Sequence, residues 1–102
     1  MATLCFVLAA TAVQAQTAKR VTYDDDVRPL FARRCFTCHG NGESKNGLSL
    51  ETYAGVMKGG ASGDAVQPGR PAASLLYLAV AQEKDGVVRM PLGQPRIPDA
   101  EI

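Results

Sequence analysis

The sequence predicts a small all-α domain of short helices and long loops. Apolar residues recur at helical spacing in three separate stretches, and no stretch shows the strict apolar–polar alternation that predicts a half-buried strand. Glycine and proline are frequent after residue 40, which divides the chain into loops. With 102 residues, the chain has room for one domain with a thin core.

The first fifteen residues differ from the rest of the chain. The segment "MATLCFVLAATAVQA" is uncharged, mostly apolar and ends in Val-Gln-Ala, which is typical of a secretory signal peptide cleaved after Ala15. We therefore expect residues 1–15 to be a signal peptide and residues 16–102 to be a mature domain exported to the periplasm or the extracellular space. The segment is too short to cross a membrane as a helix. The alternative interpretation is a buried N-terminal helix.

Cleavage would also change the cysteine content. Cys5 would leave with the signal peptide, so the mature chain would keep only Cys35 and Cys38. Export would place these two thiols in an oxidising compartment. A domain this small commonly needs a covalent or metal staple.

The stretch "YDDDVRPLFARRCFTCHG" predicts the first helix. Asp25 or Asp26 is expected to cap it, and Pro29 falls in the first turn, where its missing amide costs little. Gly40 is expected to end it. The apolar face would be formed by Val27, Leu30 and Phe31, with Arg34 or Cys35 one turn further.

Two further helices are predicted. "LSLETYAGVMKGG" would form a short helix ended by Gly59 and Gly60, with an apolar stripe of Leu50, Tyr53, Ala54 and Met57. Pro71 would open "PAASLLYLAVAQ", whose buried face would be Leu75, Leu76, Leu78 and Ala79. The proline-rich stretch after it is expected to be extended, and Asp99 would cap the first turn of another helix.

The motif Cys35-Phe36-Thr37-Cys38-His39 has the C-x-x-C-H spacing of a c-type haem attachment site. Two thiols separated by two residues can reach the two vinyl groups of one porphyrin and form thioethers. The histidine that follows can then reach the iron, for which imidazole is a common ligand. The motif predicts one covalent haem c held by Cys35 and Cys38, with His39 as an axial iron ligand.

Other sites that use these residue types would need partners that the sequence lacks. A structural zinc site needs four ligands, usually cysteine or histidine. The mature chain would supply only Cys35, Cys38 and His39, so the fourth ligand would have to be a carboxylate. A thioredoxin-like dithiol belongs near a βαβ unit, which is not predicted. A structural disulfide between the two cysteines would close a very short loop and leave His39 without a role.

The sixth iron ligand is predicted to be a methionine, because His39 is the only histidine. Met57 lies on a predicted helix stripe, where packing in the core explains it. Met90 precedes Pro91, and a residue before proline is restricted to extended conformations. Met90 can therefore project its thioether from a stiff loop, and we expect it to be the ligand. Histidine–methionine ligation is typical of electron-transfer cytochromes and raises the reduction potential.

The charged residues exclude one class of function. Net charge is +1, and no basic run is present that could follow a nucleic-acid backbone. Arg33 and Arg34 flank the motif and can meet a haem carboxylate or a redox partner. A solvated helix face is the commoner role for such arginines, and it is the role we expect.

Several segments together resemble the planctomycete-type cytochrome c domain. These are "YDDDVRPLFARRCFTCHG", "GLSLETYAGVMKGGASGDAVQPGRPAASLLY" and "RMPLGQPRIPDAEI". The resemblance covers the chain from about Val21 to its end. It implies a class I-like cytochrome c fold around one covalent haem, with Cys35 and Cys38 as attachment residues and His39 and Met90 as axial ligands.

The chain departs from the family pattern in two places. Leu92 stands where the family usually has a second proline after the methionine. The family also continues from "DAEI" into a C-terminal helix, and the sequence stops at Ile102. We therefore expect that helix to be missing and the cytochrome c domain, residues 16–102, to be truncated.

The sequence thus predicts an exported electron-transfer domain that is not an enzyme. Its partners would be redox proteins or fused domains of a longer chain, with no nucleic acid and no membrane span in the mature chain. One alternative is a haem enzyme or gas-sensing domain with an open sixth iron position. Another is a non-haem module that binds a metal through cysteine and histidine.

Overall fold

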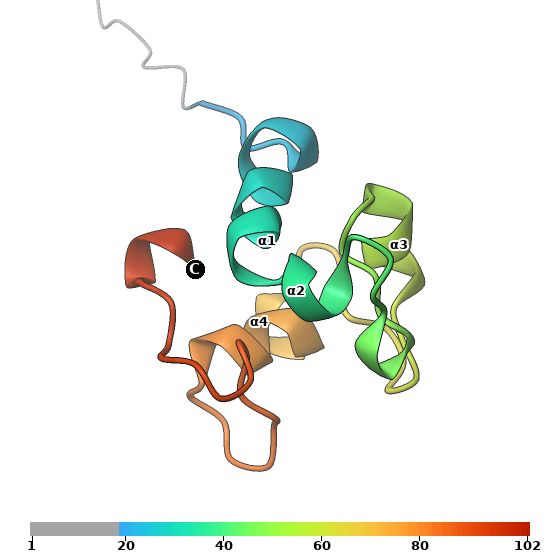
Figure 1. The fold of residues 1–102 in the computed structure, drawn as a ribbon. Helices are drawn as coiled ribbons and strands as arrows, with labels where there is room; N and C mark the ends of the chain where they lie inside the picture. Colours follow the sequence, from blue (N-terminus) through green and yellow to red (C-terminus); the bar gives the residue numbers. More distant parts are fainter. Residues whose placement is uncertain (1–18) are drawn as a thin grey trace, which may run out of the picture.

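The structure is a computed structural model that describes residues 19–102, and within this range it contains helices joined by loops and no β-strand (Figure 1). The all-α class is confirmed for these residues. The predicted signal peptide, residues 1–15, lies outside them. In chain order the elements are the π-helical turn η1 (Tyr23–Val27), α1 (Arg28–Arg34), α2 (Phe36–His39), the 3-10 turn η2 (Lys45–Gly47), α3 (Tyr53–Lys58), the 3-10 turn η3 (Pro71–Ala73), α4 (Leu75–Ala81) and the 3-10 turn η4 (Asp99–Glu101).

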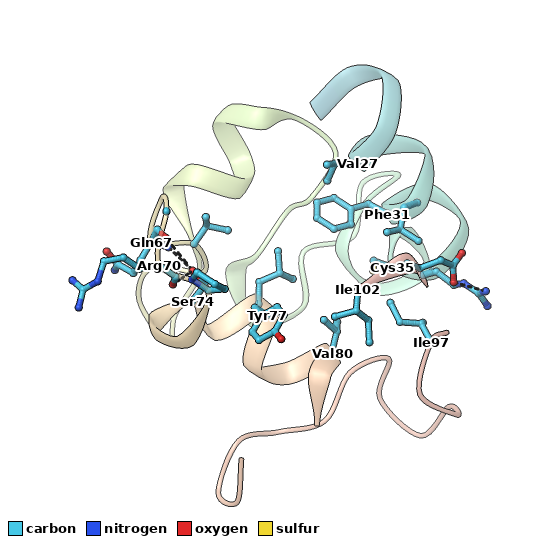
Figure 2. Close-up of a pocket in the computed structure, with 17 residues that line it drawn as sticks. Val27, Phe31, Cys35, Gln67, Arg70, Ser74, Tyr77, Val80, Ile97 and Ile102 are labelled. Atoms are coloured by element: carbon cyan, nitrogen blue, oxygen red, sulfur yellow. Dashed lines mark hydrogen bonds and ion pairs between the residues drawn. The ribbon is translucent and has the colours of Figure 1, made fainter. Parts of the chain in front are cut away.

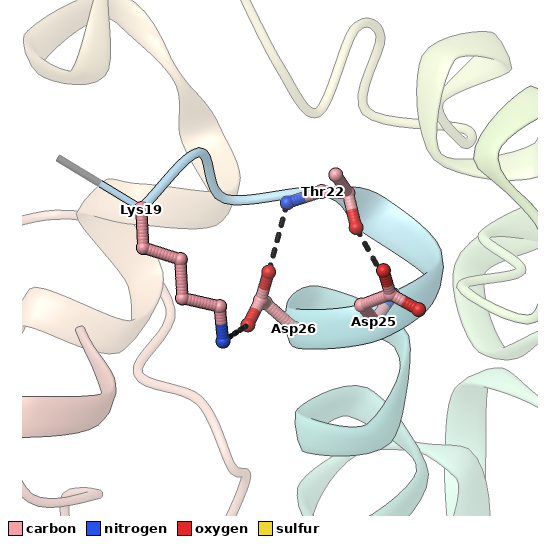
Figure 3. A network of polar contacts seen from close by, with 4 residues as sticks. All are labelled: Lys19, Thr22, Asp25 and Asp26. Carbon is pink, nitrogen blue, oxygen red and sulfur yellow. Dashed lines mark hydrogen bonds and ion pairs between the residues drawn. The ribbon is translucent and has the colours of Figure 1, made fainter. Parts of the chain in front are cut away.

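The first helical segment starts at Thr22 rather than at the aspartates that follow it. The Thr22 hydroxyl accepts a hydrogen bond from the Asp25 amide at 3.2 Å, and the Asp26 carboxylate accepts one from the Thr22 amide at 2.9 Å (Figure 3). This reciprocal pair resembles a capping box. The predicted cap was therefore wrong. The hydrogen bond from the Thr22 backbone amide and, to a lesser extent, that from the Lys19 side chain lower the pKa of Asp26.

The predicted first helix is interrupted at Cys35. The backbone there has φ −129° and ψ −25°, so α1 ends at Arg34 and α2 begins at Phe36. The Cys35 amide still donates to the Phe31 carbonyl at 2.7 Å, which keeps the two helices joined. Gly40 ends α2 as predicted, in an extended conformation, and a Cβ there would lie 2.5 Å from the Phe36 ring. The bend places the C-x-x-C-H motif at the end of α1.

The core forms where α1 and α2 meet α3 and the segment that precedes it. Its buried members are Phe31, Phe36, Leu50 and Val56. Tyr23 packs edge-on against Phe31 with 6.3 Å between the ring centroids, and its hydroxyl donates to the Leu50 carbonyl at 2.7 Å. Because Leu50 is only 1% exposed, this contact fixes the loop after the motif against α1.

The predicted apolar stripe of α3 was wrong. Val56 is the buried residue of this helix, whereas Tyr53 is 60% exposed. Leu50 is buried as expected, but it lies before the cap, Thr52, whose hydroxyl accepts from the Gly55 amide at 3.0 Å. A helix as short as Tyr53–Lys58 completes fewer than two turns, so residues before it do not share its periodicity.

The predicted third helix is shorter and buries smaller residues than expected. Pro71 opens the turn η3 rather than α4. Within α4 the burial of Ala79 is confirmed, but the three leucines are not buried and Ala81 is. The loop after α4 explains this change. The Met90 amide donates to the Ala79 carbonyl at 3.0 Å, and Arg96 Nε donates to the Ala81 carbonyl at 2.9 Å. Small side chains at these two positions let the loop lie close to the helix.

The turn η4 is tied to the end of α1 by ion pairs. The Glu101 carboxylate accepts from Arg34 at 2.9 Å and from Arg33 at 3.2 Å. Asp99 was predicted to cap a helix, but it pairs with Arg96 and makes no capping hydrogen bond. These contacts bring the loop of residues 82–98 back toward the attachment motif.

This arrangement predicts a loss of stability in acid. Burial of the Glu101 carboxyl raises its pKa. The hydrogen bonds from Arg33 and Arg34 together lower it by more, so the pKa lies below its ordinary value. A carboxyl of this kind stabilises the folded state above its unfolded pKa, and the stabilisation is lost as pH falls through the lower, folded pKa. Denaturant unfolding between about pH 6 and pH 3, followed by circular dichroism, should show a steeper loss for the natural chain than for Glu101→Gln. Equal slopes would contradict the prediction.

Candidate functional site

All four residues that the sequence predicts for haem binding line one cavity. Cys35 lies at the bend between α1 and α2, Cys38 and His39 lie in α2, and Met90 lies in the loop between α4 and η4. We call the space between them the motif cavity. Its volume of about 640 Å³ lies within the roughly 300–1,000 Å³ of small-molecule and cofactor sites. Its other lining residues are Arg33, Arg34, Thr37, Lys45, Asn46, Pro91, Leu92, Gln94, Pro95, Arg96 and Ile97.

The two cysteines of the motif are free thiols. Cys35 is half-buried and Cys38 is exposed. Burial raises the pKa of the Cys35 thiol, while the nearby Arg34 lowers it by less. Cys35 is therefore protonated at neutral pH, which disfavours thiolate chemistry at this position.

The imidazole of His39 is oriented by the backbone of the loop that follows the motif. Its Nδ1 lies 3.0 Å from the Leu48 carbonyl oxygen. A carbonyl can only accept, so Nδ1 carries a proton, and in the neutral form of the ring the lone pair is on Nε2. The Leu50 amide also donates to the His39 carbonyl at 2.7 Å. This is the arrangement by which a protein fixes the tautomer of a metal-binding histidine.

A close approach of backbones at Gly60 holds the Leu48 segment in place. The Ala61 amide donates to the Asn46 carbonyl at 2.7 Å, and Asn46 Nδ2 donates to the Ser62 hydroxyl at 2.7 Å. A Cβ at Gly60 would lie 2.6 Å from the Asn46 carbonyl oxygen and 3.1 Å from the Leu48 amide nitrogen. The sequence indicated only that the glycine pair ends a helix, and it missed this supporting contact.

Replacing Gly60 by alanine should therefore disturb His39. The new methyl group would overlap the backbone at Asn46 and push the Leu48 carbonyl, at a cost of about 1–3 kcal/mol, as for other overpacked sites. We expect the His39 Nδ1 proton to exchange with solvent faster, measured by NMR together with denaturant unfolding.

Gly86→Ala is the matched control for this substitution. Gly86 has φ +81°, and a Cβ there would meet no heavy atom within 4 Å, so alanine introduces only the cost of a left-handed backbone, about 1–2 kcal/mol. It should destabilise the chain without changing exchange at His39. The same exchange rate in both variants would show that Gly60 does not support the imidazole.

The backbone of Met90 is anchored on both sides to the end of α4. Its amide donates to the Ala79 carbonyl at 3.0 Å, and its carbonyl accepts from Gln82 Nε2 at 3.2 Å. Gln82 ends α4 in the left-handed conformation, with φ 57°. Met57, the other candidate ligand, is half-buried on α3 and does not line the motif cavity. Of the two methionines in the described range, Met90 is thus the one brought to the motif.

A second cavity adjoins the motif cavity, and the sequence did not predict it (Figure 2). It has a volume of about 350 Å³ and lies between α1, α4 and η4. Both cavities are lined by Arg34, Cys35 and Ile97, so Cys35 stands where they meet. The apolar residues of its wall are Val27, Leu30, Phe31, Val66, Leu76, Tyr77, Val80, Ile97 and Ile102.

Two other findings bear on the predicted alternatives. Residues 19–102 contain no group of three or more His, Cys, Asp or Glu side chains that could hold a metal ion. The four-ligand set of a structural zinc site is therefore not assembled in this part of the chain. In the same range, no helix has the length and apolar character needed to cross a membrane.

Comparison with known proteins identifies the family. The sequence model of the family described as Planctomycete cytochrome C matches residues 35–91, which is more than half of the chain. The matched segment begins at Cys35, includes Cys38 and His39, and ends just after Met90. No curated protein and no solved structure matches the chain. The resemblance found in the sequence is thereby confirmed, and the chain belongs to the planctomycete cytochrome c family.

Proposed function

We propose that this chain is an exported electron-transfer domain with a class I-like cytochrome c fold and one covalent haem c. Cys35 and Cys38 would hold the haem through thioethers, and His39 and Met90 would be the axial iron ligands. The single observation that carries the proposal is that these four side chains, which come from both ends of the matched segment, line one cavity.

The residues around the motif fit a haem. Both cysteines are free, so each S–H can add across a vinyl group, with sulfur and hydrogen joining its two carbons and no atom lost. The apolar wall of the adjoining cavity, including Phe31, Tyr77 and Val80, suits the hydrophobic body of a porphyrin. When bound, the haem supplies an iron that cycles between ferric and ferrous states and carries one electron.

The side chains of the protein would tune that iron. The hydrogen bond from His39 Nδ1 to the Leu48 carbonyl makes the imidazole a stronger donor at Nε2. The thioether of Met90 would raise the reduction potential relative to a second histidine. Burial beside the apolar wall acts in the same direction, because a low-dielectric environment disfavours the additional charge of ferric iron.

The anchoring of Met90 favours electron transfer over catalysis at the iron. An enzyme or gas sensor needs an open or easily displaced sixth position. Here both the amide and the carbonyl of Met90 are hydrogen-bonded to the end of α4, which fixes the backbone from which the thioether would reach the iron. The partners of such a domain would be redox proteins or fused domains that supply and accept single electrons.

Expression with the haem-maturation machinery tests the proposal. A pyridine haemochrome spectrum typical of two thioether links is expected, together with a methionine–iron charge-transfer band in the ferric protein. A high-spin spectrum with ready binding of carbon monoxide would favour the open-site alternative. Absence of covalent haem would favour a non-haem module.

Export can be tested on the same material. We expect the protein to be recovered from the periplasm or the medium, with a mass that corresponds to cleavage after Ala15. Recovery of the intact N-terminus from the cytoplasm would contradict the predicted signal peptide.

A further inference from the structure

Several positively charged residues line the motif cavity. Among its lining residues four are cations and none is an acid; the four are Arg33, Arg34, Lys45 and Arg96. Two carboxylates are paired with these cations: Glu101 pairs with both Arg33 and Arg34, and Asp99 pairs with Arg96. Four cations against two carboxylates leave an excess of two positive charges.

The helix dipole explains only part of this distribution. Asp24, Asp25 and Asp26 lie in the first turn of η1, and Arg33 and Arg34 lie in the last turn of α1, as the dipole favours. Lys45 and Arg96 belong to neither helix. They come from η2 and from the loop before η4, and only the tertiary structure brings them to the same opening.

The exposed part of this surface has the composition of a docking site. The side chain of Arg33 is 59% exposed, Lys45 is exposed, and Leu92 is 69% exposed at the same opening. Arg34 and Arg96 are less exposed, at 40% and 35%, and all three arginines, including Arg33, are paired with a carboxylate. An apolar centre within a charged rim is the usual anatomy of a protein interface.

The geometry points to an interaction surface for a negatively charged redox protein. We infer that the surface formed by Arg33, Lys45 and Leu92 docks an acidic face of the electron donor or acceptor, so that electrons pass at the mouth of the motif cavity. This inference rests on the proposed electron-transfer function. Opposite charges on two partners increase the rate of encounter and orient it, and salt weakens both effects.

Small redox probes of opposite charge test the inference without the natural partner. The ferrous protein gives one electron to ferricyanide, an anion, or to tris(phenanthroline)cobalt(III), a cation. Between about 10 and 150 mM ionic strength the Debye length shrinks from roughly 30 to 8 Å. We expect the rate with ferricyanide to fall as salt is added and the rate with the cobalt complex to rise. Poly-L-glutamate should compete with ferricyanide, and poly-L-lysine should not.

Matched variants separate this surface from the net charge. Arg33→Gln/Lys45→Gln should lower the ferricyanide rate about tenfold at low salt, the lower limit of typical steering effects. Lys58→Gln/Lys84→Gln changes the net charge equally at exposed positions that do not line the cavity, and should leave the rate nearly unchanged. Arg33→Lys/Lys45→Arg keeps both charges and should keep the natural rate.

Several outcomes would overturn the inference. Equal salt dependence for the two probes would show that the carboxylates of the haem neutralise these cations. Equal loss in both glutamine variants would assign the effect to net charge. Sedimentation with vesicles of anionic phosphatidylglycerol, abolished by Arg33→Gln/Lys45→Gln, would assign the surface to a membrane. Failure of the protein to acquire covalent haem would instead refute the proposed function on which the inference rests.

Discussion

Replacing both Cys35 and Cys38 by alanine should abolish covalent haem. The two free thiols are the only cysteine side chains in the described range, and each thioether needs one of them. After expression with the haem-maturation machinery, the denatured variant should release all of its haem into acidified organic solvent, whereas the natural protein should release none. Single substitutions should leave one link and shift the pyridine haemochrome band.

Thr37→Ala is the matched control for the cysteine variants. Thr37 lies between the cysteines and lines the motif cavity, so its replacement changes the same turn of α2 while keeping C-x-x-C-H. Full covalent haem is expected in this control. Covalent haem in the double alanine variant, or its loss in Thr37→Ala, would contradict the assignment of the attachment residues.

Replacing Met90 by leucine should remove the sixth iron ligand with little change in packing. Leucine is close to methionine in volume, and such exchanges usually cost less than about 1.5 kcal/mol. The amide and carbonyl of residue 90 can keep their hydrogen bonds to Ala79 and Gln82. We expect a high-spin ferric spectrum, binding of carbon monoxide and a fall in potential of roughly 100 mV or more, within the ~0.8 V range that axial ligation spans.

Met57→Leu is the control that separates ligation from loss of a methionine. Met57 is half-buried on α3 and does not line the motif cavity, so the spectrum and potential of this variant should match those of the natural protein. Loss of the charge-transfer band in Met57→Leu, with Met90→Leu unaffected, would reverse the assignment. No change in either variant would favour an iron that has no methionine ligand.

The errors of the sequence-based prediction share one physical cause. Helices of four to seven residues, such as α2 and α4, are shorter than the window over which a helical period can be recognised. Their boundaries and buried faces therefore depend on what packs beside them. Of the face expected to be buried in α4 only Ala79 is buried, together with Ala81, because the loop that carries Met90 and Arg96 lies against those two alanines.

The contacts that support the site could not be predicted from the sequence either. Gly60 was expected only to end a helix, and its role depends on a contact with Asn46 that forms in the folded chain. Arg33 was expected to lie on a solvated helix face. It is exposed as expected. The sequence did not show that Lys45 and Arg96, which lie far from it in sequence, line the same cavity and add their positive charges to its lining.

The sequence by itself determined the family and predicted the haem-attachment motif. This was possible because Cys35, Cys38 and His39 are near neighbours, and covalent geometry alone keeps two thiols and an imidazole within reach of one haem. The structure decided what depends on distant contacts. It brings Met90 rather than Met57 to the cavity, leaves Nε2 of His39 available through the Leu48 carbonyl, and gathers cations from three segments at one opening. These features arise from packing and hydrogen bonds between segments that only the folded chain brings together.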